Sequence, residues 1–387
     1  MTQEPQLAVA GTPASGRALR DLVVVARTPV LGTGAGVRTY GIVRALAVHR
    51  PVDVLFARFG APSPAPEYER TPGVAFHAVT PSRGIARAAA YARARAAGTP
   101  DGWARAVSHE LTRDAVRLAG AGDRGRVVAD GPEAAVALRG LARRRAVIYN
   151  AHNVESSFRE ELGGLGSARR LEAFERRLLE RFVESWMVSH RDMELAAAIA
   201  PGRPLRYVPN VVDVAAIDPV ASDRAARRIL FLADFRYPPN QEGLRFLLDE
   251  VMPRVWSELP DARLRLAGRG LEGRPSADER VEAPGFVERL RDAYAGATCA
   301  VVPLLLGGGS PLKFVEALAY GLPVVATPVA AAGLDIRDGE HYRRAQGGEG
   351  FAAALVSELS GGDEAMGARG RARAQAEYSI EALARRL

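Results

Sequence analysis

Short runs of apolar, mostly β-branched residues recur along the chain and are separated by longer stretches with helical periodicity. In the first half these runs begin at Leu22, Val52, Val74, Arg126 and Ala146. Apolar residues fill each run without alternating with polar ones, which is typical of strands buried on both faces of a parallel sheet. Helical crossovers connect such strands. The first half is therefore predicted to be an α/β domain.

A second series of the same kind begins at Arg228, Ala262, Thr298 and Leu322. The predicted fold class is α/β, with two Rossmann-like, doubly wound domains. Two open sheets side by side would leave a crevice at the carboxyl ends of their strands, where the ligands of doubly wound proteins bind. Candidate site residues are therefore expected directly after strands.

Residues 206–228 separate the two series and are rich in Pro, Asp and small residues, without a helical stripe. Such a stretch is typical of a linker between domains. The predicted organisation is a loose tail over 1–18, a first domain over 19–208, a linker over 209–228, a second domain over 229–370, and a C-terminal helix over 371–387 that packs back on the first domain.

Two helices have the clearest periodicity. Residues 166–183 place apolar side chains on one face and Glu and Arg pairs on the other, which is typical of an amphipathic helix. Residues 240–259 are also predicted to be helical. Pro253 is expected to kink that helix, because proline lacks the N–H that the helix ladder needs.

The composition agrees with this organisation. A chain of 387 residues is long for one hydrophobic core, and 48% hydrophobic with 25% charged residues is typical of a globular protein. Cys299 is the only cysteine, which excludes an intrachain disulfide and a Cys-based zinc site. No apolar run approaches the roughly 18 to 20 residues that a membrane-spanning helix needs, and no secretory signal pattern is found. We expect a cytoplasmic protein.

The chain is basic, with a formal net charge of +7 and a pI of about 9.9. This charge would suit an anionic partner, but arginine occurs throughout the chain and often alternates with Glu. Nucleic-acid binding is not expected, because no aromatic platform accompanies the arginines. Residues 83–98 are predicted to form a basic, Ala-rich helix that either is solvated or lies on anionic lipid at the inner membrane face. Its apolar anchors are only Ile85 and Tyr91, which favours the solvated alternative.

The candidate chemistry follows the third strand of the second half. Three glycines precede Ser310 and Pro311, and an amphipathic helix starts there. Glycines allow the backbone to approach a ligand closely, and a helix N-terminus favours an anion. Ser310 is the expected N-cap. This segment is therefore predicted to hold an anionic group.

Lys313, in the first turn of that helix, is the only lysine among 52 Lys and Arg residues. Its ammonium is a compact point charge that could reach the same anion; a lysine kept by chance is the alternative. Glu316 follows one turn later. It could pair with Lys313, or it could accept hydrogen bonds from the vicinal hydroxyls of a ribose.

The segment 307–334, which reads GGGSPLKFVEALAYGLPVVATPVAAAGL, resembles the donor-binding motif of family 4 glycosyltransferases of the GT-B fold. These enzymes bind nucleotide-sugars between two Rossmann-like domains. Further segments match in the same order along the chain: GTGAGVRTY at 32–40, YNAHNVE at 149–155, YVPNVVD at 207–213, FLADFRYPPNQEGLRFL at 231–247 and PGFVE at 284–288. The resemblance implies a GT-B protein with an acceptor-side first domain and a donor-binding second domain, facing each other across a cleft.

The resemblance also implies roles for individual residues. The residues that would act on the donor diphosphate and the transferred sugar are Lys313, Arg236 and His152. The donor would further contact Gly308, Gly309, Ser310, Leu312, Glu316, Phe286, Val287 and Asn210, with Phe286 and Val287 at the base and Glu316 at the ribose. The N-terminal glycine loop would include Gly34, Ala35 and Gly36. Each has an ordinary alternative: Arg236 as a solvated loop charge, His152 as a strand-end histidine, and the glycine loop as a plain βα turn.

Two positions depart from the family pattern. Gly308 stands where the first Glu of the E-x7-E signature is expected, and Val211 replaces the glycine of the Pro-Asn-Gly-Val turn. The missing Glu normally helps to position the sugar, so this role would pass to backbone N–H groups of 308–310 or be absent.

The implied reaction is transfer of a sugar from a nucleoside diphosphate to an acceptor hydroxyl with retention of configuration. We expect no metal and no further cofactor, because Lys313, Arg236 and the helix N-terminus could offset the charge on the departing diphosphate. Uracil is the expected base, with guanine or deoxythymidine as alternatives. The acceptor could be a polysaccharide, a lipid-linked glycan or a small natural product such as an antibiotic, and the protein a monomer or a homodimer.

Two other functions remain open. A GT-B sugar-nucleotide 2-epimerase would share the donor site but needs carboxylates and histidines around the sugar, and the second half has only His341. A non-catalytic nucleotide-sugar-binding protein would have lost its chemistry together with the first Glu.

Overall fold

The computed structural model describes residues 19–31, 33–60, 63–122, 124–161, 165–271, 277–307 and 309–387. The predicted tail 1–18, Gly32 and Gly308 lie outside these residues. The chain forms two compact units. The first comprises 1–151, 174–186 and 202–204, and the second comprises 152–173, 187–201 and 205–387. The second unit thus includes the stretch 209–228, which was expected as a linker, and the C-terminal segment 371–387.

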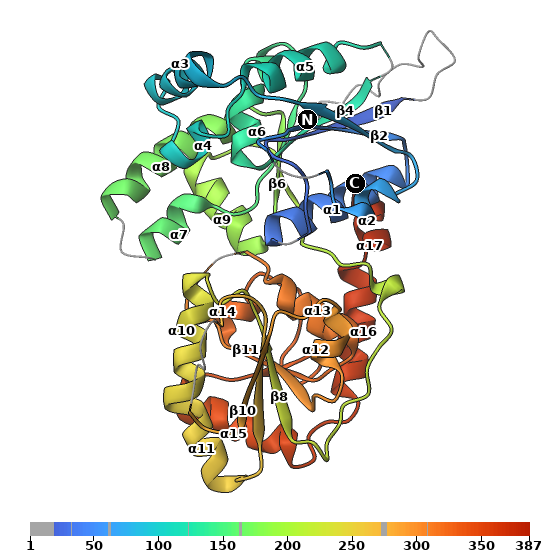
Figure 1. Cartoon of the computed structure of the whole chain (residues 1–387), viewed down its shortest axis with the longest axis vertical. Helices are drawn as coiled ribbons and strands as arrows, with labels where there is room; N and C mark the ends of the chain where they lie inside the picture. Colours follow the sequence, from blue (N-terminus) through green and yellow to red (C-terminus); the bar gives the residue numbers. More distant parts are fainter. Residues whose placement is uncertain are drawn as a thin grey trace, which may run out of the picture. The chain divides into compact units, whose positions relative to one another are not determined.

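The first sheet has the strand order β3-β2-β1-β4-β5-β6-β7 (Figure 1). Its strands are β1 Arg20–Val25, β2 Val52–Ala57, β3 Val74–Val79, β4 Arg124–Asp130, β5 Ile148–Asn150, β6 Glu184–Met187 and β7 Leu205–Tyr207. The pairs from β3 to β6 are parallel. All six residues of β2 are buried, as expected for a strand covered on both faces. The order changes direction between β1 and β4, which places a topological switch point there.

The helices of this part of the chain are α1 Gly34–Ala47, α2 Pro66–Glu69, α3 Gly84–Ala96, α4 Asp101–Ala104, α5 His109–Ala119, α6 Gly131–Leu138, α7 Glu155–Glu161, α8 Leu165–Leu179 and α9 His190–Ile199. Helix α8 confirms the prediction for 166–183, although it ends four residues earlier. Helix α3 confirms the basic helix predicted at 83–98. Its only buried residue is Ala94, and Ile85 is 89% exposed.

The second sheet is parallel with the order β10-β9-β8-β11-β12-β13. Its strands are β8 Arg228–Leu232, β9 Arg263–Ala267, β10 Val281–Gly285, β11 Cys299–Val302, β12 Val324–Ala326 and β13 Arg343–Arg344. Its helices are α10 Pro238–Phe246, α11 Met252–Glu258, α12 Leu290–Tyr294, α13 Leu312–Tyr320, α14 Pro328–Ala331, α15 Gly347–Leu359, α16 Met366–Glu377 and α17 Ile380–Arg386.

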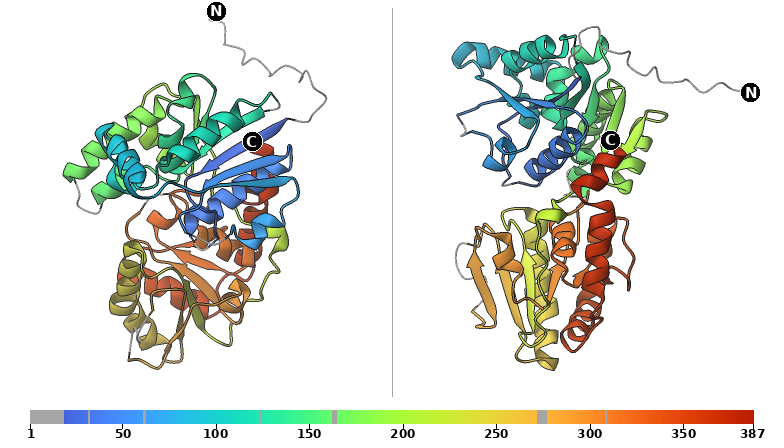
Figure 2. Two further views of the ribbon diagram at one scale, coloured as in Figure 1. Left: turned by 45° about the horizontal axis from the view of Figure 1, so that its top comes forward. Right: turned by 90° about the vertical axis from the view of Figure 1, so that its right-hand side faces the viewer.

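Alternate residues of the central strands face two separate apolar clusters. Ile229 and Phe231 of β8 pack with α10, α11 and α15, whereas Leu230 packs with α12, α13 and α16. Figures 1 and 2 show these two helix layers on opposite sides of the sheet. Because both faces are covered, the strands read as continuous apolar runs. The predicted doubly wound architecture is confirmed for this unit.

The predicted kink at Pro253 corresponds to a break in helix type. Helix α10 passes into a π-helical turn at Leu247–Val251 before α11 begins at Met252. Proline cannot donate to the preceding turn, and a π-helical turn is one way to accommodate such an interruption.

The prediction that Ser310 caps its helix is wrong. Helix α13 begins at Leu312, and Pro311 is its N-cap without a side-chain hydrogen bond. Ser310 lies one residue too early to reach the free N–H groups of the first turn.

Candidate functional site

Lys313 is the second residue of α13 and its ammonium is held by neutral groups. Its Nζ donates a hydrogen bond to Oδ1 of Asn240 and lies 5.3 Å from the centroid of the Phe231 ring. Asn240 is 4% exposed, and its Nδ2 donates to the Asp234 carbonyl oxygen at 2.7 Å. Among the described residues, no carboxylate forms an ion pair with Nζ. The ammonium is thus positioned at the carboxyl end of β8 without a direct counterion.

The surroundings of Lys313 disfavour its charge. Burial lowers the pKa of Lys313 from 10.5 to about 7, although the negative charges of Glu316 and Asp234 act in the opposite direction. Burial raises the pKa of Glu316 from 4.5 to about 7, against the effect of Lys313. A negatively charged ligand at Lys313 would restore its charged form. The site is therefore electrostatically suited to an anion.

The glycine turn before α13 is held by close backbone packing. Gly307 and Gly309 have φ angles of +122° and +79°, which favour glycine. A side chain at Gly309 would place its Cβ 2.8 Å from Oδ1 of Asn153. Nδ2 of Asn210 donates to the Ser310 carbonyl oxygen at 2.7 Å. These contacts fix the turn that precedes Lys313, and Asn210 lies against it.

Ser310 carries a buried hydroxyl that has no hydrogen-bond partner within the described residues. The residue is 5% exposed, and its Oγ is unsatisfied. A buried polar group without a partner costs about 1 to 3 kcal/mol. A ligand oxygen that bonds to this hydroxyl would recover that cost.

Glu161 of α7 and Arg191 of α9 were not predicted, and they hold the backbone of Gly307. Oε2 of Glu161 accepts a hydrogen bond from the Gly307 N–H at 2.9 Å, and Nη1 of Arg191 donates to the Gly307 carbonyl oxygen at 2.9 Å. The two side chains also form an ion pair with each other. All three residues belong to the second unit. No sequence motif links residues this far apart.

Arg236 is not directly joined to Lys313. Its guanidinium forms a two-point contact with the Asp234 carboxylate, at 2.8 and 2.5 Å. The side chains of Arg236 and Asp234 are 58% and 41% exposed. An exposed pair of this kind contributes little stability, so Arg236 could exchange Asp234 for a ligand phosphate.

Phe286 and Val287 directly follow β10. Phe286 is 59% exposed, and the guanidinium of Arg269 lies 4.7 Å from the centroid of its ring. Val287 packs against the apolar cluster that the second sheet forms with α12, α13 and α16. An exposed aromatic ring beside a guanidinium is suited to stacking of a planar base. Arg269 was not predicted.

The remaining predicted residues lie apart from Lys313 in the sequence. His152 lies two residues after the end of β5, is partly buried and belongs to the second unit. Gly34, Ala35 and Gly36 form the first turn of α1 in the first unit. Gly36 is tightly enclosed, because an added Cβ would lie 1.7 Å from the Val30 carbonyl oxygen. Its N–H already donates to Oγ1 of Thr33 at 3.1 Å.

A buried polar network at the switch point of the first sheet was also missed. Asp130 and Asn150 end β4 and β5, and Arg38 and Thr39 lie on α1. Asn150 donates to Asp130 at 2.5 Å, Arg38 donates to Asn150 at 2.6 Å, and the Thr39 hydroxyl bonds to Asp130. Polar residues that end predicted apolar strands, as in RVVAD and VIYN, are the signal that could have indicated this network.

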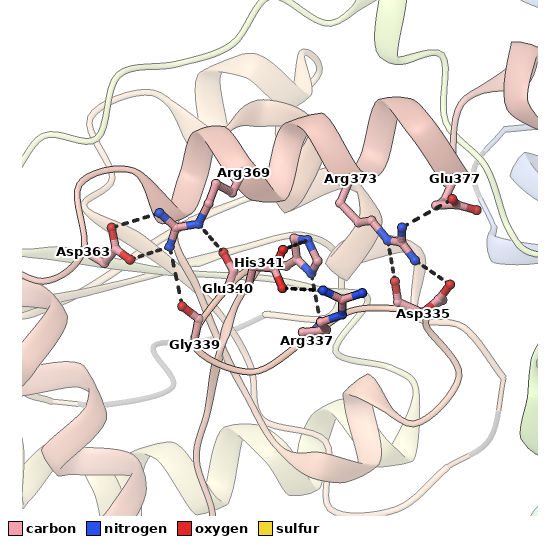
Figure 3. Close-up of polar contacts among 9 residues, drawn as sticks. All are labelled: Asp335, Arg337, Gly339, Glu340, His341, Asp363, Arg369, Arg373 and Glu377. Carbon is pink, nitrogen blue, oxygen red and sulfur yellow. Dashed lines mark hydrogen bonds and ion pairs between the residues drawn. The ribbon is translucent and has the colours of Figure 1, made fainter.

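His341, considered for an epimerase, belongs to a surface network of ion pairs (Figure 3). Its Nδ1 accepts from the Arg337 N–H at 3.0 Å, and its Nε2 lies 3.4 Å from Glu340. Burial lowers the pKa of His341, and nearby arginines act in the same direction. The negative charge of Glu340 opposes this shift, and the contacts of the ring with Arg337 and Glu340 give His341 a structural role in this network.

Within the described ranges, no group of three or more His, Cys, Asp or Glu side chains is arranged to hold a metal ion. In the same part of the chain, no helix is long and apolar enough to cross a membrane.

Comparison with known proteins supports part of the resemblance. Residues 226–360 match the family model described as glycosyl transferases group 1. The chain is 31% identical over 169 residues to a phosphatidyl-myo-inositol mannosyltransferase of Mycobacterium leprae, a match that covers 39% of this chain and 43% of that protein. A protein of the same name from Mycobacterium tuberculosis is 33% identical over 148 residues, covering 34% of this chain and 37% of that protein. The matched region thus spans about two fifths of the length of these curated relatives.

Solved structures resemble the chain along nearly its whole length. HepE of Anabaena in complex with UDP and glucose has a TM-score of 0.68 at 15% identity, and 95% of this chain and 97% of that chain are covered. Sucrose-phosphate synthase of Thermosynechococcus elongatus has a TM-score of 0.69 at 17% identity, covering 95% and 96%. The predicted fold of two Rossmann-like domains with parallel sheets, as in GT-B glycosyltransferases, is confirmed.

Proposed function

We propose that the protein is a GT-B glycosyltransferase of family 4 that transfers a hexose from a nucleoside-diphosphate sugar to an acceptor hydroxyl with retention of configuration. The observation that carries this proposal is the ammonium of Lys313, fixed by Asn240 at the start of α13 without a direct carboxylate partner. The family match over 226–360 includes this residue.

In the proposed reaction, the bond between the anomeric carbon and the diphosphate oxygen breaks, and a bond to the acceptor oxygen forms. The departing phosphate oxygen accepts the acceptor's proton. Charge grows on the diphosphate, and Lys313 and the N-terminus of α13 stabilise it. Arg236 contributes when its pairing with Asp234 is exchanged for phosphate. No step requires a metal ion.

The remaining donor contacts follow from the same region. The Ser310 hydroxyl and the turn at Gly309 would bind phosphate or sugar oxygens, Leu312 would line the turn, and Glu316 would bind the ribose hydroxyls. Phe286 and Val287 would hold the base. His152 and Asn210 are proposed near the sugar and the glycine turn, and Gly34, Ala35 and Gly36 on the acceptor side.

UDP is the proposed nucleotide, because HepE was solved with UDP and glucose. The acceptor is proposed to be a glycan, a lipid-linked glycan or a small molecule. The names of the mycobacterial relatives favour a phosphoinositide-type lipid among these, with the protein in the cytoplasm or at the inner membrane face.

The test measures turnover of UDP-, GDP- and dTDP-hexoses by the purified protein. The readout is the amount of nucleoside diphosphate released. We expect Lys313→Ala to lower the rate by a hundredfold or more, since one charge-stabilising group is worth about that much. Exposed Glu349 provides a control, and Glu349→Gln should be unchanged. Normal turnover by Lys313→Ala would refute the assignment.

A non-catalytic binding protein is the second candidate, because Gly308 replaces the family's first Glu. Tight donor binding without hydrolysis or transfer for any donor would favour it. Inversion of the C2 configuration of the donor sugar would instead indicate the epimerase.

A further inference from the structure

Phe174 of α8 lies between two guanidinium groups in the first unit. The ring is fully buried, and its centroid is 5.7 Å from the Arg139 guanidinium carbon and 5.5 Å from that of Arg177. Trp103 packs against the same ring at 5.5 Å. A buried ring that contacts two cations fixes both of them in place.

Arg143, four residues after Arg139, and Arg181, four residues after Arg177, add positive charge that acts on Arg139. Burial lowers the pKa of Arg139, and the charges of Arg177, Arg143 and Arg181 lower it further. Among the described residues, none of these four arginines forms an ion pair. Other arginines of the first unit do form ion pairs, as Arg105 does with Asp101 at 2.9 Å and Arg113 with Asp114 at 3.2 Å.

The fold offsets only part of this charge. Helix α6 ends at Leu138, next to Arg139, and α8 ends at Leu179, between Arg177 and Arg181. A helix C-terminus carries about half of a negative charge, so the four guanidinium groups keep a net positive charge. Like charges held together in this way lower stability, and an anion between them would restore it.

We propose that Arg139, Arg143, Arg177 and Arg181 form a binding site for a phosphate-bearing anion, separate from the donor residues of the second unit. The planar guanidinium fork matches phosphate geometry. The buried position of Phe174 offers no stacking platform for bases, so a phosphate group is favoured over nucleic acid. The phosphate belongs either to a small soluble molecule or to a lipid headgroup. This site extends the protein's binding chemistry beyond the proposed transfer reaction.

The experiment uses the full chain with Lys313→Gln, so that the anion cannot act through the proposed donor site. Melting temperature is measured against inorganic pyrophosphate, with sodium chloride at equal ionic strength as reference. The test variant adds Arg143→Gln and Arg181→Gln, both exposed and outside the Phe174 contact. The matched control adds Arg105→Gln and Arg113→Gln, which removes the same charge from paired, exposed positions.

We expect pyrophosphate to raise the melting temperature of the Lys313→Gln protein and of the matched control. In the test variant its apparent affinity should fall at least about tenfold, because two charge-assisted contacts are lost. Without pyrophosphate at low salt, the test variant should melt higher than the control, since repulsion is relieved.

A second arm distinguishes the two sources of phosphate. The same proteins are sedimented with phosphatidylcholine vesicles, with and without phosphatidylglycerol. Binding that needs both phosphatidylglycerol and the two arginines identifies a lipid headgroup, and a pyrophosphate response alone identifies a soluble ligand. The proposal is overturned if neither probe binds, or if test and control variants bind both probes equally.

Discussion

Lys313 and Glu316 lie one turn apart on α13, in surroundings that disfavour the charged form of each. Burial has opposite effects on the two groups, lowering the pKa of Lys313 and raising that of Glu316, both to about 7. Such a pair lowers the stability of the free protein. We infer that the pair is kept for what it binds, because burial of ionisable groups without strong pairing is unfavourable.

The pair should give stability a characteristic pH dependence. Between pH 4.5 and 7, folded Glu316 keeps a proton that the unfolded chain has lost, so stability falls as the pH rises. Between pH 7 and 10.5, the unfolded chain keeps a proton on Lys313 that the folded chain has lost, so stability rises. We expect Lys313→Met/Glu316→Gln to exceed the parent in urea unfolding free energy most strongly near pH 7.

The control for this prediction is Glu349→Gln, which removes an exposed carboxylate. Its difference from the parent should vary little over the same range. A stability difference for the double variant that is equally large at pH 5, 7 and 9 would contradict the proposed cost of the pair.

The residue types of this site could be predicted from the sequence, but the side chains that contact them could not. A solitary lysine after a glycine run indicated Lys313, and its spacing indicated Glu316. Asn240, which holds the ammonium, lies 73 residues away, and only the parallel order of β8 and β11 brings the two together. The capping role expected for Ser310 was wrong because Pro311 occupies the N-cap.

At the scale of elements, the glycine turn after β11 is held by two helices rather than by its own side chains. Glu161 at the end of α7 and Arg191 near the start of α9 bond to the N–H and the carbonyl oxygen of Gly307. Glycine at this position has a φ of +122° and is conformationally free in the unfolded chain. The two helices therefore order a turn that would otherwise lose more entropy when a ligand binds.

We expect Glu161→Gln to weaken UDP binding and to raise the donor KM by about threefold to tenfold, since roughly 1 kcal/mol of ordering is lost. The effect on kcat should be smaller, because Glu161 acts through the turn. Isothermal titration with UDP measures the affinity, and Glu160→Gln is the matched control because Glu160 is an exposed neighbour. Equal UDP affinity in the two variants would show that the contact does not position the turn.

Elements with long apolar runs could be predicted, and short or interrupted ones could not. All five strands predicted in the first half were found, whereas β6, β7, β10 and β13 were not predicted. Strands β5 and β12 have only three residues each, but both lie within longer apolar runs of the sequence. Strand β10 contains Pro284 and ends at Gly285, so its sequence resembles a turn. Such strands owe their existence to pairing with neighbours rather than to their own propensity.

At the scale of the whole molecule, each unit has a separate sheet core, and the proposed donor residues gather on the second. Loops at the carboxyl ends of β8, β9 and β10 carry Arg236, Arg269 and Phe286, and Lys313 lies in the first turn of α13, which follows β11. The carboxyl ends of parallel strands share one edge of their sheet. A nucleotide bound there should order several loops of one unit together.

Hydrogen exchange in the presence of UDP tests this arrangement on the full chain. We expect slower exchange at 234–240, 268–271, 284–288, 305–307 and 309–316, because loops that open locally exchange fastest and gain most from a ligand. Little change is expected at β2 and α5, which belong to the first unit. The N–H of Gly36 should also change little, since Thr33 already accepts its hydrogen bond. Lys313→Ala should abolish the effect in the second unit, and protection confined to the first unit would place the nucleotide elsewhere.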